Sequence, residues 1–113
     1  ANLSEANLMG CNLQNAKFSG ATLFKTEFGG ADLTKADLGK TNAVQAQFAK
    51  ANLTDAHLER INMLEGSFYK AILSGAHFYQ ANLYNVNFMG CTVGETDFTG
   101  ADLEQTIFKD WRP

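Results

Sequence analysis

Hydrophobic residues recur at every fifth position of the chain, without a slip in register from Ala1 to Asp110. In the resulting five-residue units, the first residue is Ala in 13 of 22 units, and the third is Leu in 11 and Phe in 8. The fifth residue is never apolar, and six of the ten glycines lie there. This spacing matches neither the 3.6-residue period of a helix nor the two-residue period of an ordinary strand.

A spacing of five is explained if each unit combines three extended residues with a two-residue corner. Alternation in extended backbone then points the first and third residues inward and the second outward. Glycine suits a fifth position that requires positive φ. If each corner turns the chain by about a right angle, four units close a coil of about 20 residues, and coils stack at ~4.8 Å. Residues 1–110 are thus predicted to form an all-β solenoid of about 5.5 coils, roughly 25 Å long.

The 20-residue period aligns one column of large inward side chains that begins at Leu8. We expect its five aromatic rings to stack into a continuous internal rib: Phe28, Phe48, Phe68, Phe88 and Phe108. A spacing of 15 residues produces only mixed columns. Because no coil can bury its core alone, stability should accumulate coil by coil.

The units ANLSE, ADLTK, ADLGK, ANLTD and ADLEQ resemble the A(D/N)LXX repeats of the pentapeptide-repeat protein family. The resemblance covers residues 1–110 and implies a right-handed quadrilateral β-helix. Members of that family include cyanobacterial proteins of unassigned role, secreted bacterial effectors and gyrase-binding proteins linked to fluoroquinolone resistance. The gyrase-binding group is similar to B-DNA in shape and charge and commonly dimerises through its C-terminal end. This chain departs from that group because its charge is weak and it lacks inserted loops.

The fourth residues of one face form a line of large apolar side chains in four consecutive coils: Phe24, Val44, Leu64 and Tyr84. Tyr69 and Met89 extend the apolar area on the next face. Two interpretations carry equal weight. Either these corner residues simply fold over the rod, or they form a docking stripe for a partner protein or a flanking segment.

Two polar columns are also predicted. One contains Lys17, Asp37, His57, His77 and Asp97, so that the two histidines would be stacked neighbours. Two imidazoles beside carboxylates could bind Zn²⁺, but ladder side chains run parallel rather than converge, and we expect a solvated ladder and no metal site. The other column should form hydrogen bonds from coil to coil, as amide ladders do: Asn2, Thr22, Asn42, Asn62, Asn82 and Asp102.

The composition argues against several classes of function. A net charge of −3 without clustered Lys and Arg gives no reason to expect direct nucleic-acid binding. No apolar run approaches the ~20 residues of a membrane span. We find no nucleophile elbow, no phosphate-binding glycine loop and no inward carboxylate, and we expect neither an enzyme nor a cofactor. Cys11 and Cys91 occupy small inward slots four coils apart, too far for a disulfide.

The ends of the chain carry further expectations. The repeat is already in phase at Ala1, which is not Met, so we expect a fragment of a longer, bacterial protein. Trp111 is too large for a first-position slot, and residues 111–113 are predicted to be a C-terminal cap or the start of a flanking segment. Leu3 and Leu8 would be open at the other end, which favours flanking residues there or an end-to-end homodimer.

The sequence therefore favours a non-enzymatic module that presents a rigid surface to another protein. The alternatives are a DNA-mimic protein that binds a type II topoisomerase, a secreted bacterial effector domain, or a purely structural spacer. Neither the partner nor the cellular compartment follows from the residues.

Overall fold

The computed structural model describes residues 1–108 of the 113-residue chain. The predicted cap at Trp111, and with it the segment 111–113, lies outside the described residues. Within residues 1–108 there is no helix, and no strand is longer than a single bridge residue. Accordingly, nothing in that range forms a helix with the length and hydropathy to cross a membrane.

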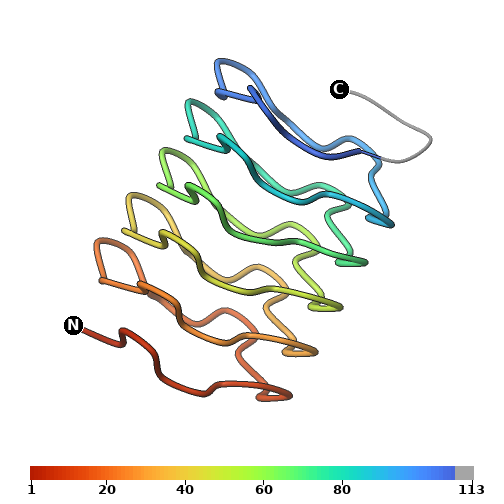
Figure 1. The fold of residues 1–113 in the computed structure, drawn as a ribbon. Helices are drawn as coiled ribbons and strands as arrows, with labels where there is room; N and C mark the ends of the chain where they lie inside the picture. The colour runs from red at the N-terminus through yellow and green to blue at the C-terminus, as the bar shows by residue number, and fades with distance from the viewer. Residues whose placement is uncertain (109–113) are drawn as a thin grey trace.

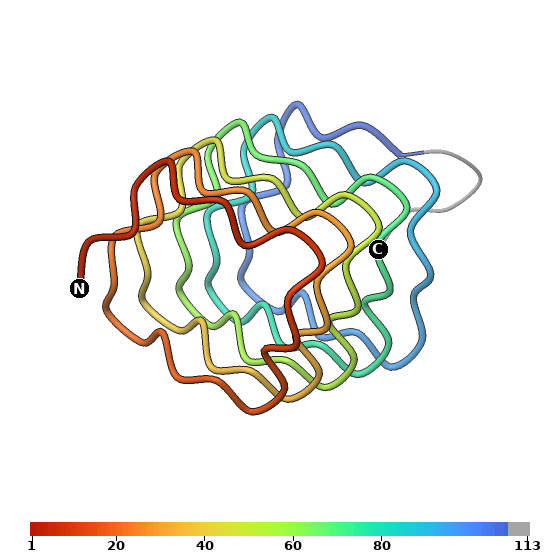
Figure 2. The ribbon, with the colours of Figure 1, turned by 90° about the horizontal axis from the view of Figure 1, so that it is seen from below.

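Isolated parallel bridges define the coil. The second residue of each unit pairs with the residue twenty positions later, from Asn2↔Thr22 to Asn87↔Ile107. Four units therefore make one coil, as the spacing predicted. The coils stack in chain order from the N-terminal end to the C-terminal end (Figure 1), and seen along the stack they are roughly four-sided loops (Figure 2). The molecule measures 33 × 20 × 18 Å.

Backbone hydrogen bonds join each coil to the next in a repeated pattern. The N–H of Leu3 donates to the carbonyl of Thr22 at 2.8 Å, and the N–H of Thr22 donates to the carbonyl of Ala1 at 2.9 Å. The fifth residue of the unit donates as well, from Glu5 to the carbonyl of Phe24 at 2.8 Å. These bonds satisfy polar backbone groups that the stacking removes from water.

A hydrogen bond closes a tight turn at nearly every described corner, as between the N–H of Ala6 and the carbonyl of Leu3 at 3.0 Å. The fifth residue of every described unit, from Glu5 to Gln105, has positive φ, with values between 55° and 76°. Type II turns have positive φ at their third residue, a conformation that glycine adopts without strain. The conformation inferred from the glycines is thus confirmed, and most units adopt it with Lys, Glu, Gln, Asn, Asp or Arg instead.

Asn and Asp at the second position stabilise the corner in a way that the sequence analysis missed. The Oδ1 of Asn52 accepts the N–H of Thr54 at 3.1 Å and its hydroxyl at 2.6 Å. The same side-chain bond to the residue two positions on recurs at Asn2, Asn7, Asn12, Asp32, Asp37, Asn62, Asn82, Asn87, Asp97 and Asp102.

The predicted amide ladder between coils is largely absent. Among the described residues it is represented by one bond, from Asn82 Nδ2 to Asn62 Oδ1 at 3.1 Å. Most side-chain oxygens of this column instead accept the N–H two residues on in their own corner, as at Asn2, Asn62, Asn82 and Asp102. These residues are therefore structural, as expected, but they act mainly within a unit.

The inward positions form a continuous core. In the middle coils the third residues, from Leu23 to Phe88, are fully buried, and nearly all first residues are buried with them. In the first coil the third residues Leu3 and Leu8 are only half-buried, because one side of that coil faces no other described layer. In the middle coils the core is thus a tube filled by these side chains.

The predicted aromatic rib is confirmed. Its ring centroids lie 4.6, 5.2, 5.5 and 5.3 Å apart, and successive rings are within 22° of parallel: Phe28, Phe48, Phe68, Phe88 and Phe108. A second stack, Phe78 on Phe98 at 5.2 Å, comes from the opposite side of the coil and meets the rib edge-on at about 80°. Both offset stacking and edge-on contact are favourable arrangements of aromatic rings.

We predict that Phe48→Ala lowers the free energy of unfolding by about 3–5 kcal/mol, because it opens a void inside a fully packed rib. The control is Tyr79→Ala, which removes a side chain that is 42% exposed and should cost less than about 1 kcal/mol. Urea unfolding followed by circular dichroism measures both. Equal losses for the two variants would contradict the assigned core.

A second prediction concerns the corner hydrogen bonds. Asn52→Ala should lower the free energy of unfolding by about 1 kcal/mol, since the N–H of Thr54 loses its acceptor. Thr22→Ala is the matched control, because Thr22 occupies the same position of another unit without such a bond. Thermal unfolding of the two variants tests this, and an Asn52→Ala variant as stable as the control would refute it.

Candidate functional site

The predicted docking residues lie in one line along the rod. Each of them lies two residues after a bridge residue. These bridge residues pair with one another in a continuous series from Thr22 to Asn82. All four side chains are half-buried, because corner residues fold partly over the rod and keep part of their surface accessible. We call this line the apolar column: Phe24, Val44, Leu64 and Tyr84. Its role in binding stays a prediction.

A second set of apolar residues lies one unit further along the coil, at the fourth position. Tyr69 is 37% exposed and Met89 is half-buried. Met9, at 58%, is the most exposed large hydrophobic residue in the described chain. Between Met9 and Tyr69 this set contains only the small residues Gly29 and Ala49.

A shallow groove of about 560 Å³ lies between the apolar column and this second set. One wall is made by the fifth residues Lys25, Gln45 and Glu65, which follow the apolar column, and the other by Met9, Gly29 and Ala49. Gln45 Nε2 donates to Glu65 Oε1 at 3.0 Å. The groove exists because glycine and alanine occupy positions where a larger side chain would fill it.

Two lysines cover aromatic rings beside this groove. Lys25 Nζ lies 5.2 Å from the ring centroid of Phe24, and Lys70 Nζ lies 5.3 Å from that of Tyr69. Such cation–π contacts are worth about 0.5–1 kcal/mol at exposed sites. The aromatic members of the site are therefore held in defined positions.

Four other large apolar side chains are exposed: Ile72, Tyr79, Val93 and Ile107. Ile72 and Ile107 occupy second positions, and their outward direction could have been inferred from the repeat. Val93 differs, because it occupies an inward third position but is 36% exposed, with no further described coil covering its face. These four residues lie on three different faces of the rod, so they do not form one surface.

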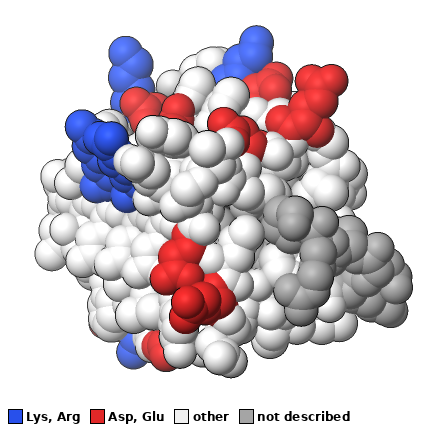
Figure 3. Space-filling view, turned by 90° about the horizontal axis from the view of Figure 1, so that it is seen from above, with Lys and Arg blue, Asp and Glu red and all other residues white. Residues whose placement is uncertain are grey.

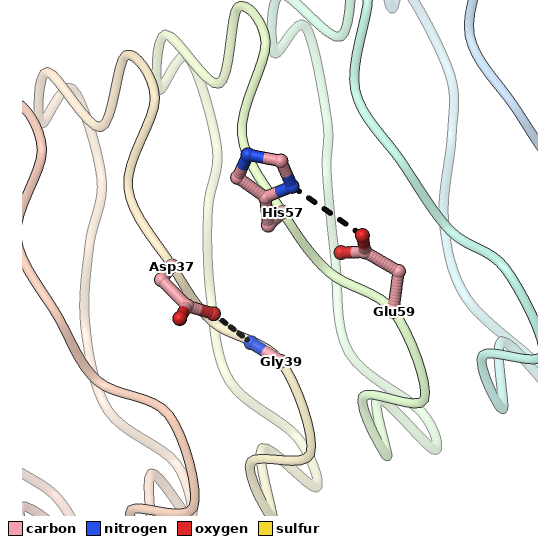
Figure 4. A network of polar contacts seen from close by, with 4 residues as sticks. All are labelled: Asp37, Gly39, His57 and Glu59. Atoms are coloured by element: carbon pink, nitrogen blue, oxygen red, sulfur yellow. Dashed lines mark hydrogen bonds and ion pairs between the residues drawn. The ribbon is translucent and has the colours of Figure 1, made fainter.

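The histidine column is present as predicted. The rings of His57 and His77 are stacked, with centroids 4.9 Å apart and planes within 7° of parallel. His57 Nδ1 lies 3.3 Å from Glu59 Oε2, and Asp37 accepts the N–H of Gly39 at 2.9 Å (Figure 4). No group of three or more metal-ligating side chains converges within residues 1–108.

Hydrogen bonds lower the pKa of two carboxylates at second positions, Asp97 in the histidine column and Asp32 on another face. Hydrogen bonds from the side chain and backbone of Thr99 lower the pKa of Asp97, and the nearby His77 adds a smaller effect in the same direction. Hydrogen bonds from Thr34 and Gln14 lower the pKa of Asp32. Both carboxylates are therefore more acidic than usual, whereas an acid–base catalyst at neutral pH needs a raised pKa.

Both cysteines are free and half-buried, at the inward positions expected for them. The Cys91 thiol donates to the carbonyl of Phe68 at 2.9 Å, and burial raises its pKa to about 12. A thiol with so high a pKa is a poor nucleophile, because the thiolate is the reactive form. Cys91 is thus a packing residue.

Charged side chains of both signs are mixed on the rod surface. On the side shown in Figure 3, both acidic and basic residues are present, and the basic residues do not form a continuous track. Lys40 and Arg60 border a second shallow groove, of about 430 Å³, together with Asp37 and Glu59. This surface lacks the clustered positive charge that phosphate binding requires.

Comparison with solved structures supports the fold. The chain is similar to the pentapeptide repeat protein Rfr23 from the cyanobacterium Cyanothece 51142, with 21% identity and a TM-score of 0.80 over 96% of this chain and 91% of that one. It is also similar to a pentapeptide repeat protein from the thylakoid lumen of Arabidopsis thaliana, with 26% identity and a TM-score of 0.64 over 94% of this chain and 70% of that one. No curated protein matches the chain significantly.

The family comparison covers almost the whole chain. The model for pentapeptide repeats matches in eight copies, over residues 1–39, 26–63, 65–93 and 71–110. These matches agree with the five-residue register and with the bridges between residues twenty positions apart. The chain therefore belongs to the pentapeptide repeat family, whose members are generally non-enzymatic β-helical repeat proteins.

Proposed function

We propose that this chain is a non-enzymatic protein–protein interaction or scaffolding module, and that the apolar column is its docking surface. The observation that carries the proposal is the alignment of four large apolar side chains on consecutive coils, all half-buried: Phe24, Val44, Leu64 and Tyr84. Protein interfaces are commonly anchored by aromatic and aliphatic side chains at the centre of a polar rim. Here amide and charged residues flank the column on both sides.

The rod suits this role because its surface is fixed before a partner arrives. In the middle coils backbone hydrogen bonds link the corners to the coils on both sides, and stacked rings fill the core beneath. A preorganised surface loses little conformational freedom on binding, and affinity benefits from that. We include in the proposal that the coil is right-handed and quadrilateral with about 5.5 turns, a view that the family and the twenty-residue bridges support.

Two of the alternative functions, the DNA mimic and the secreted effector domain, have less support. A DNA mimic would need continuous acidic columns, but acidic residues on the described surface stand among lysines and amides. No observation favours a secreted effector domain. Both alternatives stay predictions.

Site-specific photo-crosslinking in extracts of the source cells tests the docking surface. A photoreactive residue at Leu64 should capture a defined protein, whereas the same residue at Ser74 should not. Ser74 is a matched control because it occupies a half-buried fourth position of the same coil on another face. Capture of the same proteins at both positions would contradict the proposal.

A competition assay with unlabelled protein tests whether the apolar column is required for the crosslink at Leu64. Unlabelled rod should suppress the crosslink at Leu64, and a rod with Phe24→Ser, Leu64→Ser and Tyr84→Ser should do so at least about tenfold less well, since truncated anchor residues typically dominate binding. A second triple variant, Ile72→Ser, Tyr79→Ser and Val93→Ser, removes apolar surface elsewhere and should compete like the unchanged rod. Circular dichroism and thermal unfolding verify that both variants are folded.

A further inference from the structure

We propose that the apolar column binds an amphipathic α-helix of the partner protein, lying parallel to the rod axis with basic residues beside its apolar stripe. This inference rests on the proposed function, because it specifies what occupies the docking surface. Three features support this helix. The side chains of the apolar column are spaced like the turns of a helix, a groove lies beside the column, and carboxylates outnumber ammonium groups near it.

The spacing of the coils is the first argument. Stacked rings on successive coils are 4.6 to 5.5 Å apart in the core, and the His57 and His77 rings at the surface are 4.9 Å apart. An α-helix advances about 5.4 Å per turn, so side chains on one of its faces recur at nearly the same interval. Side chains on one face of an extended strand recur about every 6.6–6.8 Å, and those of a polyproline helix about every 9.3 Å. Only the helix can place one apolar residue against each coil in succession.

The length of the column is the second argument. From Phe24 to Tyr84 it crosses three coil-to-coil steps, which corresponds to about three turns or ten residues of a helix. Over that length the two spacings drift apart by less than about 2 Å, an offset that side-chain rotamers can absorb. Apolar residues at positions i, i+3 or i+4, i+7 and i+11 of the helix would then meet the four members of the column in order.

The groove supplies a place for the body of the helix. One wall consists of the fifth residues that directly follow the column, Lys25, Gln45 and Glu65, and the other wall contains Gly29 and Ala49, which keep the groove open. The 58%-exposed Met9 lines its far edge, and Tyr69 and Met89 lie further along the same series of fourth positions. Methionine adapts its shape to irregular partners, which favours contact with a helix surface over a single small ligand.

Charge around the column selects a basic helix. The groove beside the column is lined by two carboxylates and one ammonium group, from Glu27, Glu65 and Lys25. Three more carboxylates of the face that carries the column lie beyond its two ends: Glu5, Asp102 and Glu104. On the far edge of the groove the charge is reversed, with Lys50 and Lys70 following Ala49 and Tyr69. Complementary potentials steer association and fix orientation. The lysines and arginines of the helix should therefore lie on its side nearest Glu65.

Two model peptides test the geometry directly. Both contain leucine and lysine in identical proportion and are about 14 residues long, labelled with fluorescein. In one the leucines recur at three- and four-residue spacing, which forms an amphipathic helix, and in the other they alternate with lysine, which forms a strand. Fluorescence anisotropy at low salt measures the binding of each peptide to the rod.

We expect the helical peptide to bind at least about tenfold more tightly than the alternating one, a difference that equal composition cannot produce through charge alone. The triple variant Phe24→Ser, Leu64→Ser and Tyr84→Ser should abolish this preference, and the variant Ile72→Ser, Tyr79→Ser and Val93→Ser should keep it. Glu65→Lys should weaken binding of the helical peptide several-fold, because it reverses the charge of a carboxylate that directly follows a member of the column.

Equal binding of the two peptides, or a preference that survives the first triple variant, would overturn the helix proposal. That outcome is distinguishable from failure of the proposed function. If the photoreactive residue at Leu64 still captures a protein that Ser74 does not, the column is an interaction site whose partner is not a helix. If neither experiment depends on the column, both proposals fail.

Discussion

Pairing of backbone groups between residues twenty positions apart is the constraint on which the rest of the structure depends. It repeats from Asn2↔Thr22 to Asn87↔Ile107 without interruption. Because each unit pairs only with the units directly before and after it in the stack, every position of the unit becomes a straight column along the rod. The aromatic rib, the stacked histidines and the apolar column are three results of this single register. A one-residue insertion would disrupt all of them together, since it would turn inward side chains outward.

The conformational cost of this arrangement lies at the corners, where the fifth residue of each unit has positive φ. Left-handed backbone costs a non-glycine residue roughly 1 kcal/mol, yet most fifth positions are occupied by long polar residues such as Lys25 or Glu65. The cost is offset locally. The fifth residue donates its N–H to the next coil, the turn is closed by a backbone bond, and an Asn or Asp at the second position often accepts a further N–H. Strain at each corner is therefore balanced by bonds of the same corner, so that no distant part of the molecule has to compensate.

Much of this fold could be predicted because one period determines it. The five-residue spacing predicts which residues point inward, and the column of phenylalanines selects a coil of twenty residues. The hydrogen-bond partners of the Asn and Asp side chains could not be predicted in the same way. A column of amides is compatible with bonds between coils or within a corner, and only the side-chain torsion decides between them. The exposure of Val93 could not be predicted either, because it depends on whether another coil covers that face and not on the residue type.

The apolar column has a different status from the core, because the fold does not require it. First and third positions are restricted by the volume of the tube, and exceptions there are compensated, as where Met63 fills the space beside Gly66. Fourth positions carry no such restriction. On two of the other faces they are mostly Ser, Thr, Gln, Glu and Gly within the same turn geometry. The turns therefore do not require large apolar residues at this position on four consecutive coils. Since exposed apolar surface also raises the risk of aggregation, its alignment on one edge of a rigid rod is best explained by a surface that another protein covers.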